Sequence, residues 1–412
     1  MSAVFGGRWT SLRNGRPRTD DSLIGTPRAR HLDGIRGLAA LGVLLFHCIY
    51  LTGYWGTLYR QSHAVGTFIA NAANFCVCIF FALSGFLLFK EFLGGILFDE
   101  ERAPTARYLA RRFLRIYPAY WAALLGFVVL IGAADLRGSV FGLVTLTERN
   151  LNRTEELPGI PVAWTLYIEV AFYAFLPIAA AVLTQLCRRK SAVTRVRIVV
   201  GSLIAMAAFS MLWIFLVDRF AEADLRLMLN LPAYLGWFSA GMVLAVILCC
   251  RDHGLVIAPR LTRLAEHSWW CWSVALLLNI GVERLGLLAS SDQSAAQVQM
   301  RLAALAIAAF LVLLPLVMSS RPSKIHLFVG STGIVWVGMM SYGVYIWHWS
   351  VAKKLVELLT IQGSLGGTLA LIALVLPISL LLGWISFRVI EKPAMSLAPS
   401  RPTGSVESQR DH

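Results

Sequence analysis

The segment HLDGIRGLAALGVLLFHCIY, residues 31–50, opens the apolar part of the chain and carries two ionisable side chains, Arg36 and His47. The eleven steps from one to the other make close to three helical turns, so both side chains lie on one helix face, roughly 16 Å apart along the axis. A central Arg costs ~2.5 kcal/mol or more to place in a bilayer, which favours a functional site that faces protein or a cavity. The alternative is structural: an Arg that reaches the membrane surface and a His bonded to a neighbouring helix.

Composition places the chain among integral membrane proteins. Of its 412 residues, 57% are hydrophobic and 15% charged, whereas soluble domains carry about 25% charged residues. The prediction is an all-α polytopic membrane protein with about ten transmembrane helices. Its apolar runs, each near the length that crosses a bilayer, lie at 34–54, 66–89, 114–134, 162–186, 196–217, 229–250, 268–288, 301–319, 334–357 and 366–389. The run at 268–288 is the weakest, because Glu283 and Arg284 lie near its end.

Basic residues orient these helices. With the N-terminus in the cytoplasm, the inner connections hold 26 and the outer connections 10 of the 37 Lys and Arg residues, and Arg36 is the remaining one. The positive-inside rule therefore predicts a multi-pass plasma-membrane protein with both termini cytoplasmic. The net charge of +14 then reflects retention at the inner leaflet, and we expect no nucleic-acid partner.

Three regions are expected along the chain: a basic cytoplasmic arm without fixed structure (1–30), a membrane domain (31–393) and a short cytoplasmic tail (394–412). The seven Cys residues form no CxxC pair and have no His partner at ligand spacing, so we expect neither a metal site nor disulfides. The two halves of the chain show no repeat, which argues against a secondary transporter built from inverted repeats.

Three ionisable side chains are predicted at one depth in the outer half of the membrane. At 1.5 Å per residue, His47 lies about 20 Å and His348 about 21 Å from the inner ends of their helices, and Glu169 lies about 10 Å below the outer surface. If the helices are neighbours, we expect Glu169 to pair with His47 and fix its tautomer. The alternatives are a protonated structural carboxyl for Glu169 and a place in an interfacial aromatic belt for His348.

The segment RRFLRIYPAYW, residues 111–121, places Arg111, Arg112 and Arg115 at the inner end of a helix, the last two on one face. Guanidinium forks bind two phosphate oxygens at once, so the cluster suits a phosphate-bearing ligand. Ordinary positive-inside anchoring explains the same residues.

These segments carry a family resemblance. An Arg, ten residues and a His on the first helix resemble the opening motif of the acyltransferase 3 family of membrane proteins. Five further motifs follow in family order, so that the resemblance spans about residues 31–393. They are IFFALSGFLLFK (79–90), RRFLRIYPAYW (111–121), AWTLYIEVAFYAFLP (163–177), SYGVYIWHWS (341–350) and FRVIEKP (387–393). The chain departs from the family pattern at Cys78, where many members have a polar residue, and at Thr165, where Ser is commoner.

The resemblance implies a membrane O-acyltransferase that uses cytoplasmic acyl-CoA as donor substrate and holds no bound cofactor. The acyl group, most simply acetyl, would pass to a hydroxyl of an extracytoplasmic or lipid-linked acceptor: a carbohydrate, a glycolipid or a small metabolite. The alternative from another class is a transporter or flippase for a lipid-linked or acylated small molecule, with His47 and Glu169 coupled to protons.

The resemblance also implies roles for individual residues. His47 would act as general base or acyl relay, tuned by Glu169, and Arg36 would hold the donor or polarise its carbonyl. The acyl-CoA-binding group would comprise Arg111, Arg112, Arg115, Tyr117 and Ser84, although Ser84 with Gly85 also suits close backbone packing. The acceptor-side or supporting group would comprise Asp33, Trp164, Thr165, Tyr345 and His348.

Overall fold

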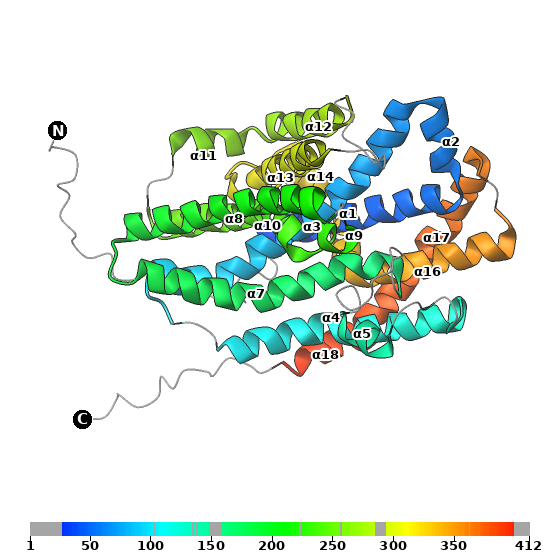
Figure 1. Cartoon of the computed structure of the whole chain (residues 1–412), viewed down its shortest axis with the longest axis horizontal. Helices are drawn as coiled ribbons and strands as arrows, with labels where there is room; N and C mark the ends of the chain where they lie inside the picture. Colours follow the sequence, from blue (N-terminus) through cyan, green and yellow to red (C-terminus); the bar gives the residue numbers. More distant parts are fainter. Residues whose placement is uncertain are drawn as a thin grey trace.

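The computed structural model describes residues 27–101, 104–133, 136, 139–147, 159–221, 224–255, 258–284, 294–361 and 363–398. All regular structure within these ranges is helical, and the longer helices run roughly along the long axis of the molecule (Figure 1). The predicted all-α polytopic architecture is confirmed. Eight described helices are long and apolar enough to cross a membrane. They are α1 (Pro27–Leu51), α3 (His63–Leu97), α4 (Thr105–Leu130), α7 (Trp164–Cys187), α8 (Ala192–Phe220), α10 (Leu231–Asp252), α13 (Ala295–Met318) and α17 (Leu365–Ser386).

The remaining two apolar runs are helical but differ from the prediction. The run at 268–288 forms the short helix α12 (Ser268–Arg284). The run at 334–357 is broken at Met340, whose backbone angles (φ −106°, ψ 13°) leave the helical region, and it forms α15 (Thr332–Met339) and α16 (Ser341–Leu359). The number of membrane crossings and the cytoplasmic side of the termini stay predictions. The arm up to residue 26 and the tail from residue 399 lie outside the described residues.

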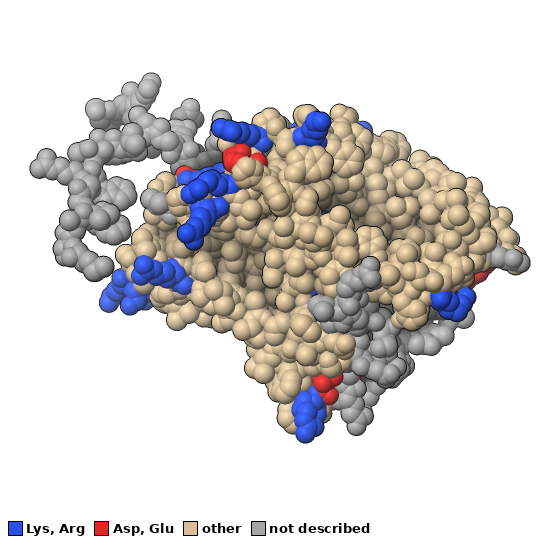
Figure 2. Space-filling model, turned by 90° about the horizontal axis from the view of Figure 1, so that it is seen from above, with Lys and Arg blue, Asp and Glu red and all other residues tan. Residues whose placement is uncertain are grey.

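The surface fits a membrane environment. On the face seen in Figure 2, most of the molecule is covered by uncharged side chains, and several Lys and Arg side chains gather near one end. Large apolar side chains such as Leu125, Ile178 and Leu277 are exposed on the outside of the bundle. In lipid, exposed apolar side chains cost nothing, and helices associate through close packing and hydrogen bonds instead.

Helix α3 is the centre of the bundle and packs against α1, α7, α10, α12 and α13. Two glycines bring α3 and α10 into backbone contact: a Cβ on Gly241 would collide with the carbonyl of Ala82, and a Cβ on Gly85 with that of Phe238. Small residues allow helix backbones to approach this closely. Close packing therefore accounts for Gly85, one of the two explanations that the sequence left open.

This contact gives a prediction about stability. Gly241→Ala forces a methyl group into the main chain of α3, and overpacking of this kind costs about 1–3 kcal/mol. We expect a lower unfolding temperature and a smaller yield of monodisperse protein in size-exclusion chromatography. Gly201→Ala on α8 is the matched control, because a Cβ there meets no atom within 4 Å. Equal unfolding temperatures for the two variants would contradict the packing argument.

Helix α1 is fixed in the same way. A Cβ on Gly37 would lie 2.7 Å from the carbonyl oxygen of Ile334 and 2.8 Å from the amide nitrogen of Gly338 on α15. A Cβ on Gly34 would collide with the carbonyl of Val329, at the end of α14 (Lys324–Val329). The N-terminal half of α1, which carries Arg36, is thus held in backbone contact with its neighbours.

Candidate functional site

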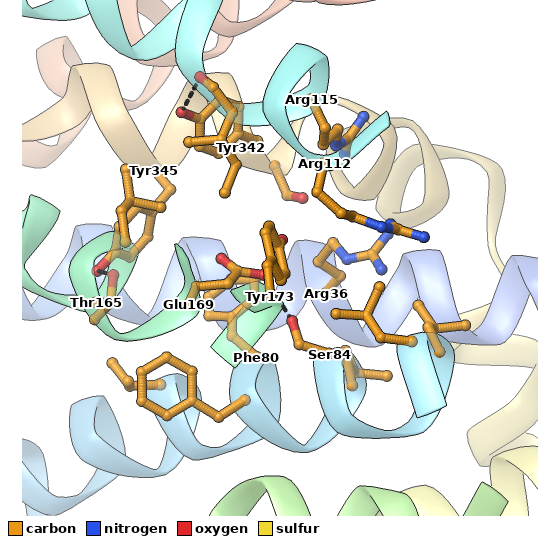
Figure 3. Close-up of a pocket in the computed structure, with 18 residues that line it drawn as sticks. Arg36, Phe80, Ser84, Arg112, Arg115, Thr165, Glu169, Tyr173, Tyr342 and Tyr345 are labelled. Carbon is orange, nitrogen blue, oxygen red and sulfur yellow. Dashed lines mark hydrogen bonds between the residues drawn. The ribbon is translucent and has the colours of Figure 1, made fainter. Parts of the chain in front are cut away.

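A cavity of about 130 Å³ lies between α1, α3, α4, α7 and α16 (Figure 3). Segments from across the chain supply its polar lining, and seven of these side chains belong to the residues predicted for the site. The predicted residues that line it are Arg36, Ser84, Arg112, Arg115, Thr165, Glu169 and Tyr345. Tyr173, Ser341 and Tyr342 complete the polar lining.

Three guanidinium groups gather at one end of this cavity, those of Arg36, Arg112 and Arg115 (Figure 3). Each has a carboxylate partner. Arg36 donates to Asp33 (3.1 Å), Arg112 is paired with Glu91, and Arg115 lies 3.8 Å from Glu391. A guanidinium has five N–H donors, so one carboxylate leaves each Arg with donors for a further anion. We call these three residues the arginine cluster.

Glu169 faces the same cavity. Its Oε1 accepts hydrogen bonds from the Ser84 hydroxyl (2.7 Å) on α3 and from the Tyr173 hydroxyl (2.7 Å) one turn along α7. The carboxyl group is therefore oriented by two donors and adds an acid to the lining that holds the arginine cluster. This network ties α3 to α7 at the level of Arg36 on α1.

His47 forms a pair with His348. Nδ1 of His47 lies 2.8 Å from Nε2 of His348, and Nδ1 of His348 lies 3.2 Å from the carbonyl oxygen of Val344. A carbonyl only accepts, so in the neutral pair Nδ1 of His348 carries its proton and Nε2 accepts from His47. His47 is left with a lone pair on Nε2. The hydrogen bonds thus assign one tautomer to each ring, and His47 holds the geometry of a base.

The expected pairing of His47 with Glu169 is wrong. Glu169 is engaged by Ser84 and Tyr173 in the arginine-lined cavity, whereas the partner of His47 is His348. The predicted common depth is also wrong for Glu169, because Glu169 lies at the level of Arg36, roughly three helical turns from His47 along α1. At the level of His47, the ionisable neighbour comes from α16, which packs on α1.

Tyr345 lies between the cavity and the His pair. Its ring lines the cavity and has its centroid 5.8 Å from that of His348. Its hydroxyl donates to the carbonyl of Val162 (3.0 Å) and lies 2.9 Å from the Thr165 hydroxyl, which ties α16 to the start of α7. Thr165 therefore keeps the hydroxyl function of the commoner Ser and uses it to position Tyr345.

Comparison with known proteins agrees with the motifs in this site. Residues 30–388 match a family described as an acyltransferase domain, a range that covers most of the chain. The chain belongs to the acyltransferase 3 family. It is 24% identical over 387 residues to a candidate membrane-bound transacylase, BcsY, of Komagataeibacter xylinus, across 90% of this chain and 84% of that relative. No solved structure matches the chain significantly. The protein is a membrane acyltransferase.

The remaining predicted residues of the acyltransferase lie outside the cavity lining. The Tyr117 hydroxyl donates a hydrogen bond to the carbonyl of Thr145 (3.0 Å) at the end of α5 (Val140–Thr145). This hydroxyl therefore points to α5 and not to the arginine cluster. Trp164 contacts the ring of Tyr234. Arg111 precedes Arg112 on α4 and is absent from the lining, whereas Arg112 and Arg115 share the cavity-facing side, as their spacing predicted.

Sequence reasoning missed three residues of this acyltransferase site. Tyr173 follows Glu169 by four residues within a quoted motif, so helical spacing could have identified it. Tyr342 lines the cavity and donates to the carbonyl of Ile116 (2.8 Å), a contact between two distant segments. Glu391 is fully buried beside Arg115, and its partner could not have been read from the motif FRVIEKP.

Proposed function

We propose that this acyltransferase moves an acyl group, most simply acetyl, from cytoplasmic acyl-CoA to a hydroxyl of an extracytoplasmic or lipid-linked acceptor, such as a sugar. One observation carries the proposal: two different sites lie along α1. At Arg36, α1 borders a cavity with three guanidinium groups, and at His47 it carries an imidazole whose tautomer is fixed by a hydrogen bond. The first suits the phosphates of the donor, and the second suits activation of a hydroxyl.

The donor would bind at the arginine cluster. Ligand pockets for drug-sized molecules measure about 300–1,000 Å³, and this cavity measures about 130 Å³. It is therefore sized for part of the donor, and the nucleotide would remain at its mouth. Arg36 is roughly 16 Å from His47 along α1. That separation supports a donor-holding role for Arg36, because a carbonyl attacked at His47 would be out of its reach.

The acyl transfer would depend on Nε2 of His47. The acceptor hydroxyl attacks the thioester carbonyl and gives its proton to this nitrogen, so that a C–O bond forms. The C–S bond then breaks, and the imidazolium returns the proton to the leaving thiolate, which yields an ester and free CoA. Throughout, Nδ1–H of His47 donates to His348, which keeps the reactive nitrogen directed to the substrate. Glu169 enters this proposal as the acid of the donor cavity, not as the partner of His47.

The direct test is to incubate the purified acyltransferase with radiolabelled acetyl-CoA and a panel of glycan and glycolipid acceptors. The expected result is release of CoA and transfer of label that both require His47. If wild type and His47→Ala release CoA equally slowly with every acceptor, the enzyme lacks the proposed donor or the proposed base. Mass spectrometry of envelope glycoconjugates from a deletion strain would identify the acceptor.

A second prediction concerns donor binding. Each hydrogen bond to a charged group contributes about 1.5–3 kcal/mol, so Arg112→Gln and Arg115→Gln should each weaken CoA binding roughly 10- to 100-fold in calorimetry. Arg111→Gln is the matched control, since Arg111 is adjacent in sequence but does not line the cavity. If all three variants weaken binding equally, the affinity comes from general surface charge and not from the cavity.

A further inference from the structure

A second cavity lies on the outside of the bundle, between α15 and the C-terminal part of α17, and has a volume of about 310 Å³. Its walls are two tryptophans, Trp336 and Trp384, together with Met339, and these side chains are 41%, 39% and 43% exposed. In a bilayer, such a hollow in the apolar surface is accessible to lipid. We call it the α15–α17 groove.

One end of this groove is positively charged. Arg388 and Lys392 line it, both are exposed, and they are one turn apart on continuous helix. The guanidinium of Arg388 lies 5.8 Å from the centroid of the Trp384 ring, which is cation–π distance and holds the charge over the groove. Among the residues that the structure describes, no acidic side chain lines the groove, whereas two basic ones do.

A π-helical turn, η4 (Phe387–Glu391), separates the charges at this end. On one side, Glu391 is fully buried, accepts from the Ser386 hydroxyl (3.3 Å) and lies 3.8 Å from Arg115 of the donor cavity. On the other side, Arg388 and Lys392, in α18 (Lys392–Ser396), line the groove. Wide turns of this kind are rare and are frequently found at functional sites. The turn directs the acid inward and both bases outward.

We propose that the α15–α17 groove binds one anionic phospholipid, with its phosphate on Arg388 and Lys392 and an acyl chain along Trp336, Met339 and Trp384. A phosphodiester has two non-bridging oxygens, so Arg388 and Lys392 can each donate to one of them, and the apolar walls match the chain that follows the phosphate. Basic side chains at a membrane boundary attract anionic lipids in general, but here they form one end of a hollow with aromatic walls. This proposal stands independently of the donor and acceptor proposed above.

The test uses the full-length protein in detergent, titrated with phosphatidylglycerol or phosphatidylcholine and followed by native mass spectrometry. We expect one retained phosphatidylglycerol per chain and little phosphatidylcholine. Arg388→Gln with Lys392→Gln should weaken phosphatidylglycerol binding roughly tenfold or more. The matched control is Arg260→Gln with Arg263→Gln on α11 (Pro259–Glu266), where both side chains are also exposed and basic, and binding should be unchanged.

A second variant guards against misfolding of the first. Met339→Trp keeps both charges and fills the groove, so it should also lower retention of phosphatidylglycerol while the unfolding temperature stays close to that of wild type. Equal loss in the α11 pair, equal retention of the two lipids, or unchanged binding in the Arg388 and Lys392 variant would each overturn the proposal. None of these outcomes depends on acyl transfer, so failure here leaves the catalytic proposal intact.

Discussion

Replacing His47 with Ala should lower the rate of acyl transfer roughly 10²- to 10⁴-fold, the range by which general base catalysis commonly contributes. The affinity for CoA should change little, because the arginine cluster lies roughly three helical turns away. Initial rates of CoA release, combined with calorimetry of CoA binding, separate the two effects. A lower transfer rate with an unchanged CoA affinity is the result expected of a base that acts at a distance from the donor phosphates.

The control for this variant is His267→Ala, because His267 is exposed at the end of α11 and does not line the cavity. Its rate should equal that of wild type. A His47→Ala protein that transfers at the wild-type rate would remove His47 from the mechanism. If the His47→Ala protein loses CoA binding together with activity, His47 has a structural role.

Replacing His348 with Ala should lower the rate roughly 10²-fold, although His348 would never touch the substrate. Without the acceptor at its Nε2, His47 is free to place its proton on either nitrogen and to turn its ring, so the productive tautomer is no longer fixed. Loss of tautomer control of this kind can cost up to about 10⁴-fold in catalytic triads. His348→Gln should restore part of the rate, because its amide oxygen can accept from Nδ1–H of His47.

Rescue by Gln distinguishes positioning from packing. Ser350→Ala is the control on the same helix: Ser350 is also fully buried, and its hydroxyl has no hydrogen-bond partner in the described structure. Its removal should leave the rate unchanged. If His348→Gln is as slow as His348→Ala while both bind CoA normally, the tautomer assignment is wrong and the ring contributes only its volume.

Helix positions and same-helix relations followed directly from the sequence. Apolar runs predicted every long helix that the structure describes. The 3.6-residue repeat placed Arg36 and His47 on one face of α1, and Arg112 and Arg115 on one face of α4. The structure turns the first face to α16 and the second to the cavity. These predictions hold because local geometry fixes them. The sequence did not predict the break at Met340, which occurs where Gly338 packs against the main chain of Asp33. An apolar run in the sequence does not reveal such a contact with another helix.

Relations between helices were harder to predict. Glu169 and His47 have similar estimated depths, yet Glu169 bonds to Ser84 on α3 and His47 to a ring on α16. Which side chains meet depends on helix order and tilt, and apolar periodicity encodes neither in a bundle surrounded by lipid. The contact between Arg115 and Glu391 joins distant segments through a π-helical turn, and sequence periodicity carries no mark of such a turn.

The backbone contacts of Gly34 and Gly37 give α1 little freedom to slide against its neighbours. Within α1, the separation of Arg36 and His47 is fixed at roughly 16 Å by the helical rise. For a donor bound as proposed, α1 then fixes the distance between the phosphate site at Arg36 and the base at His47. The enzyme would select donors by the length of the segment that joins the phosphates to the thioester, before the acyl group itself is recognised. A donor analogue with a shorter segment between phosphate and thioester could reach the arginine cluster or His47 but not both at once. Such an analogue would inhibit the enzyme without acylating the acceptor.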